Sequence, residues 1–322
     1  MITRKISFSD VLQGAHKFLL MKKGKTLFSV NLEVTRRCNL QCNFCDYWKD
    51  KSPERRLEDY GSIIRKLNPL HMTLTGGEPL LRRDIEEVIS RIRSQTGFVY
   101  INLITNGRLL SIEKALSIWR AGLSQLSVSL DFLDERHDLN RGCPGLWRHL
   151  SDTLPELART EIDNLCLNTV IMKENLDDLL DIAATAKEWG FKVSFSTYNR
   201  YKSNNPEHSI GDDRLRDLER AIDGLIAWKR KYRNINNSDF YLQNIPRYFR
   251  DGGIGGCLAG RKWVQVSPDG VLRRCSDKEI LGEIQGYKPD LVPFTSCREC
   301  WYACRGEAEA PLGLKRIVEV NR

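Results

Sequence analysis

The sequence predicts an α/β fold: a partial barrel of about six strand–helix units followed by a small C-terminal module. Three observations predict it. Short apolar runs alternate with segments of helical periodicity from residue 28 to about residue 198. The chain, at 322 residues, is longer than one average domain. A glycine-rich stretch at 252–256 precedes a late group of cysteines. Such alternation is typical of a parallel sheet covered by helices, here with fewer units than a closed eight-stranded barrel.

The strands and helices follow in order along the chain. We expect barrel strands at residues 29–34, 71–75, 99–105, 124–130, 165–171 and 192–196. The amphipathic segments between them are the expected helices, at 57–67, 83–94, 111–121, 146–157 and 176–189. A polar stretch at 199–211 and a charged helix near 212–233 then break the alternation. We therefore divide the chain into an N-terminal amphipathic helical extension (1–27), a barrel core (28–198), a bridging region (199–256) and a C-terminal module with its tail (257–322).

Composition limits the location and the partners. No apolar run is long enough to span a bilayer and the N-terminus does not resemble a signal peptide, so we expect a cytoplasmic protein. Ten cysteines in such a chain indicate metal or redox chemistry. The net charge of +8 is spread along the chain, so no nucleic-acid partner is expected. Residues 8–21 have helical amphipathicity; packing against the core is the preferred interpretation, and contact with a membrane surface is the alternative.

A loop with three cysteines follows the first expected strand. The segment "CNLQCNFC" places Cys38, Cys42 and Cys45 at C-x3-C-x2-C spacing, with no fourth cysteine nearby. Its asparagines and glutamine make it a poor core segment. A zinc site would need a distant fourth ligand. A [4Fe–4S] cluster held by only three thiolates keeps one iron open, and that iron can chelate a small molecule.

This pattern resembles the signature of the radical S-adenosylmethionine (SAM) superfamily, which has an aromatic residue before the third cysteine, here Phe44. The resemblance implies that the open iron binds the amino and carboxylate groups of SAM. An electron from the cluster then cleaves SAM to a 5′-deoxyadenosyl radical, which abstracts hydrogen from a substrate. It also implies a low-potential electron donor such as flavodoxin or ferredoxin.

Three further segments resemble family motifs: "TGGEPLLR", "SVSLD" and "LNTVIMKENLDDL". A lone GGEP is otherwise a plain turn, and a serine at a strand end is ordinary. The resemblance implies close backbone approach at the glycines, a contact of the glutamate with the SAM ammonium, a ribose contact from the serine, and a carboxylate or ribose contact from the asparagine. The residues implied to bind SAM are Gly76, Gly77, Glu78, Pro79, Phe44, Ser129 and Asn168.

Two other segments receive narrower predictions. In "ITNG", Asn106 is expected to support the turn, although its backbone can approach the cofactor. "HDLNRG" resembles a stretch of family members with a C-terminal cluster domain, so Arg141 is expected to hold a carboxylate near the site. His137 alone is expected to be a helix-cap or surface residue.

A second cysteine group lies near the C-terminus. Cys257 and Cys275 flank an expected hairpin with its turn at Pro268-Asp269-Gly270, and "CRECWYAC" follows. Tetrahedral sulfur sites suit either zinc or iron. The spacing resembles the twitch domain, a shortened SPASM domain, which implies an auxiliary [4Fe–4S] cluster and hence two clusters in all. The implied ligands are Cys257, Cys275, Cys297 and Cys300, with Cys304 as an alternative ligand, a structural residue or, less favoured, a hydrogen-donating thiol.

Of the remaining cysteines, Cys166 is expected in the core and Cys143 in a loop after the fourth strand. The predicted function is that of a radical SAM enzyme acting on a peptide or small metabolite, with the auxiliary cluster transferring electrons during oxidation or maturation chemistry. Only residues 1–27 precede the barrel, so a leader-binding domain is not expected. The alternatives are a lipid or isoprenoid substrate and a non-enzymatic metal-binding protein. The sequence identifies no catalytic side chain and no single substrate.

Overall fold

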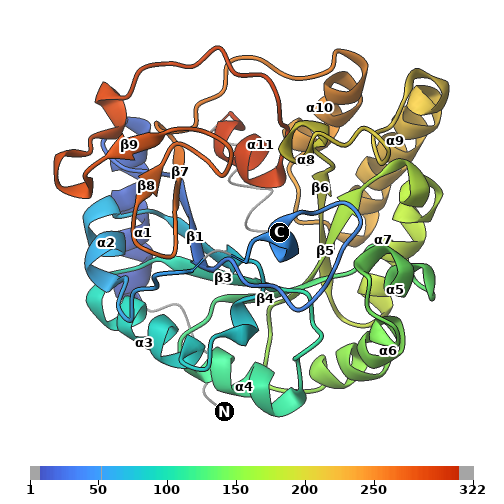
Figure 1. Ribbon diagram of the computed structural model, residues 1–322, viewed down its shortest axis with the longest axis horizontal. Helices are drawn as coiled ribbons and strands as arrows, with labels where there is room; N and C mark the ends of the chain where they lie inside the picture. The colour runs from blue at the N-terminus through green and yellow to red at the C-terminus, as the bar shows by residue number, and fades with distance from the viewer. Residues whose placement is uncertain (1–7, 52, 312–322) are drawn as a thin grey trace.

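The computed structural model describes residues 8–51 and 53–311. Six parallel strands lie side by side in chain order and curve into a partial barrel (Figure 1). They are β1 (Ser29–Thr35), β2 (His71–Gly76), β3 (Tyr100–Thr105), β4 (Gln125–Ser129), β5 (Leu165–Ile171) and β6 (Lys192–Thr197). Each expected strand is present within about two residues of its predicted ends, and the α/β fold class is confirmed.

Helices cover the outside of this sheet (Figure 1). They are α2 (Gly61–Leu67), α3 (Ile85–Gln95), α4 (Ile112–Arg120), α6 (Leu146–Leu157) and α7 (Leu179–Glu188). Each has a regular apolar stripe; α3, for instance, buries Ile85, Val88, Ile89 and Ile92. Ser111 begins α4 by accepting a hydrogen bond from the backbone N–H of Lys114.

Side chains alternate along the strands. In β1, Val30, Leu32 and Val34 are fully buried in the main apolar core, whereas Ser29, Asn31 and Glu33 line a cavity inside the barrel. The period of two places successive side chains on opposite faces of the sheet. The apolar core therefore lies between the sheet and its helices, and most residues that line the inside of the barrel have polar side chains.

The C-terminal module continues the same sheet. Its strands are β7 (Trp263–Val266), β8 (Leu272–Arg273) and β9 (Ile280–Gly282). β7 pairs with β1 in parallel, with Ser29 opposite Trp263, while β8 and β9 follow antiparallel. The expected hairpin is confirmed: Gly270, at φ +84°, donates to the carbonyl of Ser267. Nine described strands thus form one sheet.

One short helix, α11 (Ala303–Glu309), lies on the open side of the barrel between β6 and β7 (Figure 1). Thr197 of β6 donates its hydroxyl to the carbonyl of Trp301 at 2.7 Å, just before α11. The backbone N–H of Ala303 donates to the hydroxyl of Ser196 at 3.3 Å. These bonds attach the helix to the last barrel strand, so it closes the gap that six strands leave.

The bridging region is helical. Its helices are α8 (Arg200–Ser203), α9 (Leu215–Tyr232) and α10 (Asp239–Arg250). The sequence predicted α9 but not α10, which contains Pro246 and begins with Ser238 accepting from the backbone N–H of Tyr241. Short 3₁₀ turns complete the chain at Tyr47–Lys49, Pro79–Leu81, Lys173–Asp178, Asp212–Arg214, Ile284–Gly286 and Pro289–Leu291.

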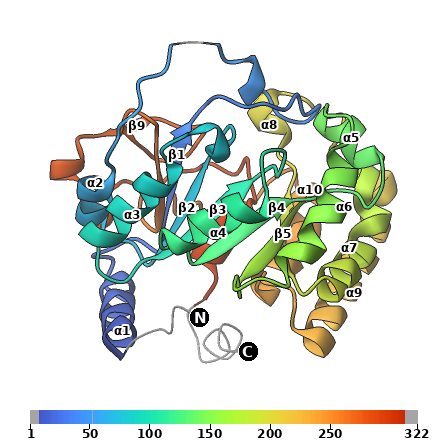
Figure 2. The ribbon, with the colours of Figure 1, turned by 90° about the horizontal axis from the view of Figure 1, so that it is seen from below.

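Helix α1 (Phe8–Lys22) packs below the barrel, at the end opposite the cysteine loop (Figure 2). Buried Lys17 donates to the carbonyl of Pro69 at 3.2 Å, and Gln13 accepts from the backbone N–H of Phe98 at 2.7 Å. These contacts hold the helix against the barrel, but Val11, Leu12 and Leu19 of its expected apolar face are more than half exposed, so the apolar packing predicted for this segment is only partly present. Among the described helices, none has the length and apolarity needed to cross a membrane.

Candidate active site

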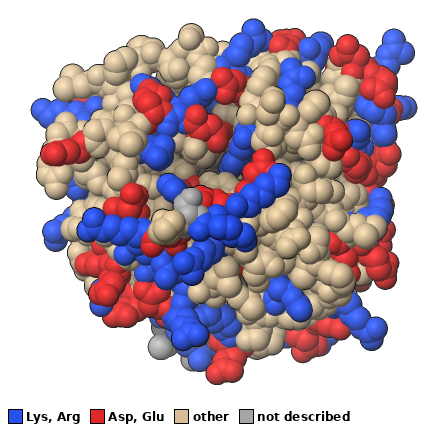
Figure 3. Space-filling view, viewed as in Figure 1, with Lys and Arg blue, Asp and Glu red and all other residues tan. Residues whose placement is uncertain are grey.

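A cavity of about 1350 Å³ occupies the inside of the barrel. Strands β1 to β7 and helices α1 and α11 contribute side chains to its wall. Figure 3 shows the hollow near the middle of one face, bordered by charges of both signs. Cavities for single small molecules usually measure about 300–1,000 Å³. The barrel therefore has space for SAM together with a second molecule.

The three-cysteine loop lies directly after β1 and is held by a short helix, α5 (Arg136–Arg141), that the sequence did not predict. The backbone N–H of Gln41 donates to the carbonyl of Arg141 at 3.3 Å, and that of Asn43 to the carbonyl of Asn140 at 3.1 Å. Cys42 is buried, whereas Cys38 and Cys45 are partly exposed. The loop is thus fixed to the turn at which α5 ends.

The glycine pair at the end of β2, Gly76 and Gly77, lies against the start of this loop. The backbone N–H of Gly77 donates to the carbonyl of Thr35, and that of Glu78 to the carbonyl of Arg37, both at 2.8 Å. A Cβ atom on Gly76 would lie 2.0 Å from the Thr35 oxygen, and one on Gly77 would lie 2.1 Å from the Arg37 oxygen. The close approach of the two backbones therefore requires glycine at both positions.

Replacing Gly77 with alanine is expected to displace the cysteine loop. The new methyl group would collide with backbone, which cannot rotate away as a side chain can. We expect the variant to lose most of its reconstituted iron at the three-cysteine loop, because the loop must move to relieve the clash. Iron analysis of the reconstituted variant measures the loss of iron, and the melting temperature measures the accompanying change in stability. Gly255→Ala is the matched control, since a Cβ at Gly255 meets nothing within 4 Å; equal iron losses in both variants would contradict the prediction.

Glu78 is almost completely buried and joins the ends of β2 and β3. Its carboxylate accepts from the hydroxyl of Thr105 at 2.7 Å, the backbone N–H of Asn106 at 2.7 Å and that of Leu80 at 2.9 Å. Burial raises the pKa of this carboxyl, while the hydrogen bonds oppose that rise. A carboxylate has about four acceptor positions, so capacity for one further donor is left. The contact of Glu78 with SAM stays a prediction.

Asn106 combines its expected turn role with a contact to the cysteine loop. Its side-chain oxygen accepts from the backbone N–H of Arg108 at 3.0 Å, which supports the turn. Its amide nitrogen donates to Asn39 at 2.9 Å and lies 3.9 Å from the sulfur of Cys38. A donor beside a thiolate stabilises its negative charge.

A buried ion pair lies beside the cysteine loop. Arg141 donates to the fully buried carboxylate of Asp131 through Nε at 2.8 Å and Nη2 at 2.7 Å. Its guanidinium lies 5.1 Å from the centre of the Phe44 ring. Burial raises the pKa of Cys42 to about 12, and the charge of Arg141 opposes that rise. The carboxylate that Arg141 holds in the described chain is therefore that of Asp131.

The expectation for His137 was wrong. Its side chain is fully buried, and its Nδ1 accepts a hydrogen bond from the backbone N–H of Asp131 at 3.2 Å. Burial lowers the pKa of His137 to about 4, which keeps the ring neutral. The residue supports the backbone of the Asp131–Arg141 pair.

The remaining predicted SAM contacts lie on the same side of the fold. Ser129 is the last residue of β4, and its register partner Asn168 lies in the middle of β5; Ser129 is buried, and Asn168 lines the cavity. Pro79 is buried in the 3₁₀ turn that follows the glycine pair. No ligand contact is assigned to these residues by the geometry alone.

The second cysteine group is brought together around one small apolar cluster. Cys257 and Cys275 are buried in it with Ala259, Trp263 and Ala308, and Cys297 and Cys304 pack against it. Cys300 is also buried; burial raises its pKa, and so do the neighbouring thiols of Cys257, Cys304 and Cys275. Cys304 lies in α11 and lines the barrel cavity as well. Cys166 is buried in β5, as expected, and Cys143 lies in the loop between α5 and α6.

A second buried guanidinium accompanies this group. Arg305 is fully buried and donates to the carbonyls of Cys300 at 2.7 Å and Gly255 at 3.0 Å. Burial raises the pKa of Cys257 and of Cys300, and the positive charge of Arg305 partly opposes that rise. Neither Arg305 nor Asp131 was predicted from the sequence as a site residue. Their positions immediately after Cys304 and at the end of "SVSLD" were the available signals.

Both groups supply the thiolates that iron–sulfur clusters require. Within residues 8–51 and 53–311, no three Cys, His, Asp or Glu side chains stand close enough together to share one metal ion. Both donor sets consist of thiols, three in the loop and up to five in the second group, so their chemistry fits an iron–sulfur cluster at each group.

The cavity wall contains a histidine that gives a pH prediction. His71 lies partly stacked on Tyr100, with ring centroids 5.6 Å apart, and burial lowers its pKa to about 4. The unfolded chain binds this proton near pH 6.5. Above pH 6.5, neutral His71 therefore makes its full contribution to the free energy of unfolding. This contribution is lost as the pH falls towards 4.

The free energy of unfolding of the parent protein should fall between about pH 7.5 and pH 5. In His71→Asn we expect this fall to be smaller by about 1–2 kcal/mol. Urea unfolding of the parent protein and the variant at each pH measures the two free energies of unfolding. Protonation of carboxyl groups affects both proteins alike, so its effect largely cancels when the two free energies are subtracted. Parallel pH profiles for the two proteins would contradict the prediction.

Comparison with known proteins gives consistent results. The model of the radical SAM superfamily matches residues 32–186. GTP 3′,8-cyclase from Aquifex aeolicus is 35% identical over 298 residues, which cover 81% of this chain and 86% of that relative. The solved structure of SuiB from Streptococcus suis superposes with a TM-score of 0.64 at 17% identity, covering 88% of this chain and 70% of that one. The structure of anSMEcpe with bound AdoMet gives 0.60 at 20% identity, with coverages of 82% and 79%. At such identities the solved structures show similarity of fold alone.

Proposed function

The chain belongs to the radical SAM superfamily, and on that basis we propose that it cleaves SAM reductively and uses the resulting 5′-deoxyadenosyl radical to abstract hydrogen from a peptide or small-metabolite substrate. It is therefore an enzyme that uses SAM and a [4Fe–4S] cluster. When bound, these cofactors supply the electron and the radical. The chain supplies their binding, their orientation and the exclusion of water.

One observation carries the proposal. The three-cysteine loop, the glycine pair and α5 are joined by backbone hydrogen bonds at the carboxyl ends of β1 and β2. This is the end of a parallel barrel at which active sites are built. A zinc-binding scaffold would need neither this junction nor a large cavity inside the barrel.

Each part of the junction has a proposed role. Cys38, Cys42 and Cys45 hold the cluster and leave one iron for SAM. Gly76 and Gly77 let the backbone approach SAM, and Glu78 accepts a hydrogen bond from its ammonium group. The remaining proposed SAM contacts come from Phe44, Pro79, Ser129 and Asn168.

For the second group we propose an auxiliary [4Fe–4S] cluster of the twitch type. Its ligands are Cys257, Cys275, Cys297 and Cys300, with Cys304 as the alternative ligand. Four thiolates make a closed cluster suited to electron transfer. Iron near eight atoms per chain supports two clusters, whereas iron near four with zinc present would overturn this assignment.

The substrate is proposed only by class. The curated relatives are named for the cyclisation of GTP, which makes GTP a second candidate. One structure of SuiB is described as bound to the precursor peptide SuiA. We propose that a flavodoxin or ferredoxin supplies the low-potential electron.

The deciding experiment is anaerobic reconstitution followed by addition of dithionite and SAM. Formation of 5′-deoxyadenosine by the reduced protein is the expected result, and its absence from reduced, iron-loaded protein would overturn the proposal. A parallel reaction with deuterated GTP tests the second candidate. Deuterium in the 5′-deoxyadenosine supports GTP as substrate, and unlabelled product excludes it as the hydrogen source.

A further inference from the structure

Helix α1 has its polar and apolar residues in an unusual arrangement. Lys17 and Met21, four residues apart, are buried and so mark the side of the helix that faces the barrel. Lys17 donates to the carbonyl of Pro69 at 3.2 Å, and burial lowers its pKa to about 8. Burying a charged group is costly unless it is hydrogen-bonded. The side of α1 that packs against the protein is therefore partly polar.

The outer side of α1 is apolar. Val11, Leu12 and Leu19 are 55%, 55% and 58% exposed, and Ala15 is exposed between them. Their successive spacings of one, three and four residues place all four on one side of the helix. A single exposed leucine is ordinary, but an apolar stripe along one helix marks an interaction surface. We call these four residues the α1 face.

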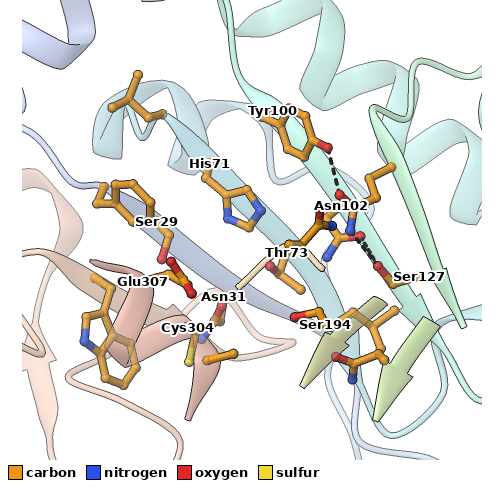
Figure 4. A pocket seen from close by; sticks show the side chains of 18 of the residues that line it. Ser29, Asn31, His71, Thr73, Tyr100, Asn102, Ser127, Ser194, Cys304 and Glu307 are labelled. Carbon is orange, nitrogen blue, oxygen red and sulfur yellow. Dashed lines mark hydrogen bonds between the residues drawn. The ribbon is translucent and has the colours of Figure 1, made fainter. Parts of the chain in front are cut away.

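The α1 face continues into the wall of the barrel cavity. Val11, Ala15 and Leu19 line the cavity although they are also exposed, so the cavity reaches the surface at α1. Farther along the strands the wall is polar; Ser127, for example, donates to Asn102 at 2.8 Å (Figure 4). The lining residues that come just before β1, β2 and β3 are apolar: Phe28, Leu70 and Phe98. The opening of the cavity beside α1 is therefore apolar.

Lysines gather at the C-terminal end of α1. Lys22 is the last residue of the helix, Lys23 follows it, and both are exposed. Just beyond them is a hollow of about 390 Å³. The charged residues that line this hollow are three lysines and one aspartate: Lys25, Lys66, Lys288 and Asp290. The α1 face thus ends beside a surface with an excess of positive charge.

We propose that the α1 face and these lysines bind the surface of a membrane that contains anionic phospholipids. The apolar side chains of an amphipathic helix enter the boundary between headgroups and acyl chains, while lysines beside the helix attract the lipid phosphates. Such contact needs no helix that spans the bilayer. Docking in this way would place the apolar opening of the cavity at the membrane. The proposal goes beyond the proposed function and does not depend on SAM cleavage.

Charge disfavours two other ways of covering the α1 face. A second copy of the chain would bring the same lysines to the contact, because a two-fold interface repeats one surface on both partners. Residues 312–322 lie outside the described structure, and their charged residues are three basic ones and one glutamate: Lys315, Arg316, Glu319 and Arg322. Like charges brought together at an interface repel each other. An anionic lipid surface is therefore the better match for this face.

Sedimentation of the full, iron-loaded chain with lipid vesicles under anaerobic conditions tests the proposal. Vesicles of phosphatidylcholine with about 30% phosphatidylserine are compared with vesicles of phosphatidylcholine alone. We expect the protein to bind the anionic vesicles at least about tenfold more tightly than the neutral ones, because several lysines each add to the attraction. Binding to the anionic vesicles should weaken as salt is added, since salt screens exposed charges.

The Leu12→Gln/Leu19→Gln variant tests the apolar part of the surface. We expect its binding to the anionic vesicles to be weaker by about tenfold or more, because two exposed leucines no longer enter the bilayer. The matched control is Leu109→Gln/Leu291→Gln, which changes two leucines outside α1 that are 46% and 71% exposed. The control should bind the vesicles as the parent protein does.

The Lys66→Ala/Lys288→Ala variant tests the basic part. Each lysine near an anionic surface strengthens binding by about fivefold, so we expect this variant to bind the anionic vesicles more weakly by that factor for each lysine removed. Its binding to neutral vesicles should not change. Circular dichroism checks that each variant is folded. If the leucine variant does not fold, the lysine variant and the salt dependence decide.

Several results would overturn the proposal. They are failure of the parent protein to bind anionic vesicles, equal binding to neutral vesicles, unchanged binding in Leu12→Gln/Leu19→Gln, and equal weakening in the leucine control. A parent dimer that Leu12→Gln/Leu19→Gln abolishes, without vesicle binding, would instead assign the α1 face to a second copy of the chain. Vesicle binding only after removal of residues 312–322 would assign the face to that segment and would likewise contradict the proposal.

Discussion

Replacing Cys42 with alanine is expected to abolish SAM cleavage and to remove about four iron atoms per chain. The loop offers only three thiolates, and Cys42 is the buried one. Two thiolates on a loop fixed by α5 cannot hold a cluster that already has one open iron. Iron analysis and chromatography of 5′-deoxyadenosine after dithionite reduction measure the effect.

Cys143→Ala is the control for this variant. Cys143 lies in the loop between α5 and α6, outside both cysteine groups. It should retain the iron content and the cleavage of the parent protein. Full iron content together with cleavage in Cys42→Ala would show that the three-cysteine loop is not the cluster site.

Replacing Asp131 with asparagine is expected to lower the free energy of unfolding by about 3–5 kcal/mol. The change leaves the buried guanidinium of Arg141 without its ion-pair partner. Arg141 also ends the helix whose carbonyls hold the cysteine loop, so we expect a lower yield of reconstituted cluster as well. Urea unfolding followed by circular dichroism under anaerobic conditions measures the stability.

An exposed ion pair provides the comparison. Arg159 and Glu156 are 2.6 Å apart with side chains 73% and 59% exposed. Glu156→Gln should change the free energy of unfolding by about 1 kcal/mol or less. The Asp131→Asn/Arg141→Met double variant should recover part of the lost stability, because it removes the unpaired buried charge. If Asp131→Asn lowered the free energy of unfolding by less than about 1 kcal/mol, the Asp131–Arg141 pair would matter no more than an exposed ion pair, which would contradict the prediction.

The strands were predictable because their signal is local. Apolar runs separated by amphipathic segments determine six parallel strands and their helices without knowledge of distant contacts. The pairing of β7 with β1 was not predictable, since it joins residues far apart in the chain. Helix α10 was missed because Pro246 interrupts its pattern, and α11 because it has only seven residues.

The site divides in the same way. The cysteine spacings are local and led to both groups. The roles of Asp131 and Arg305 depend on tertiary contacts, which no sequence spacing describes. His137 stands among polar residues and was expected to cap a helix or lie at the surface, yet it is completely buried and accepts a hydrogen bond from the backbone of Asp131.

Strand β1 has a consequence for electron movement. The carboxyl end of β1 leads into the three-cysteine loop. The edge of β1 that does not pair with β2 pairs with β7, which belongs to the module that contains the second cysteine group. One set of sheet hydrogen bonds therefore fixes the separation of the two proposed redox centres. Electron transfer between them would therefore take place across a separation that the β1–β7 pairing sets. Control of that transfer is left to whatever occupies the cavity between the two groups.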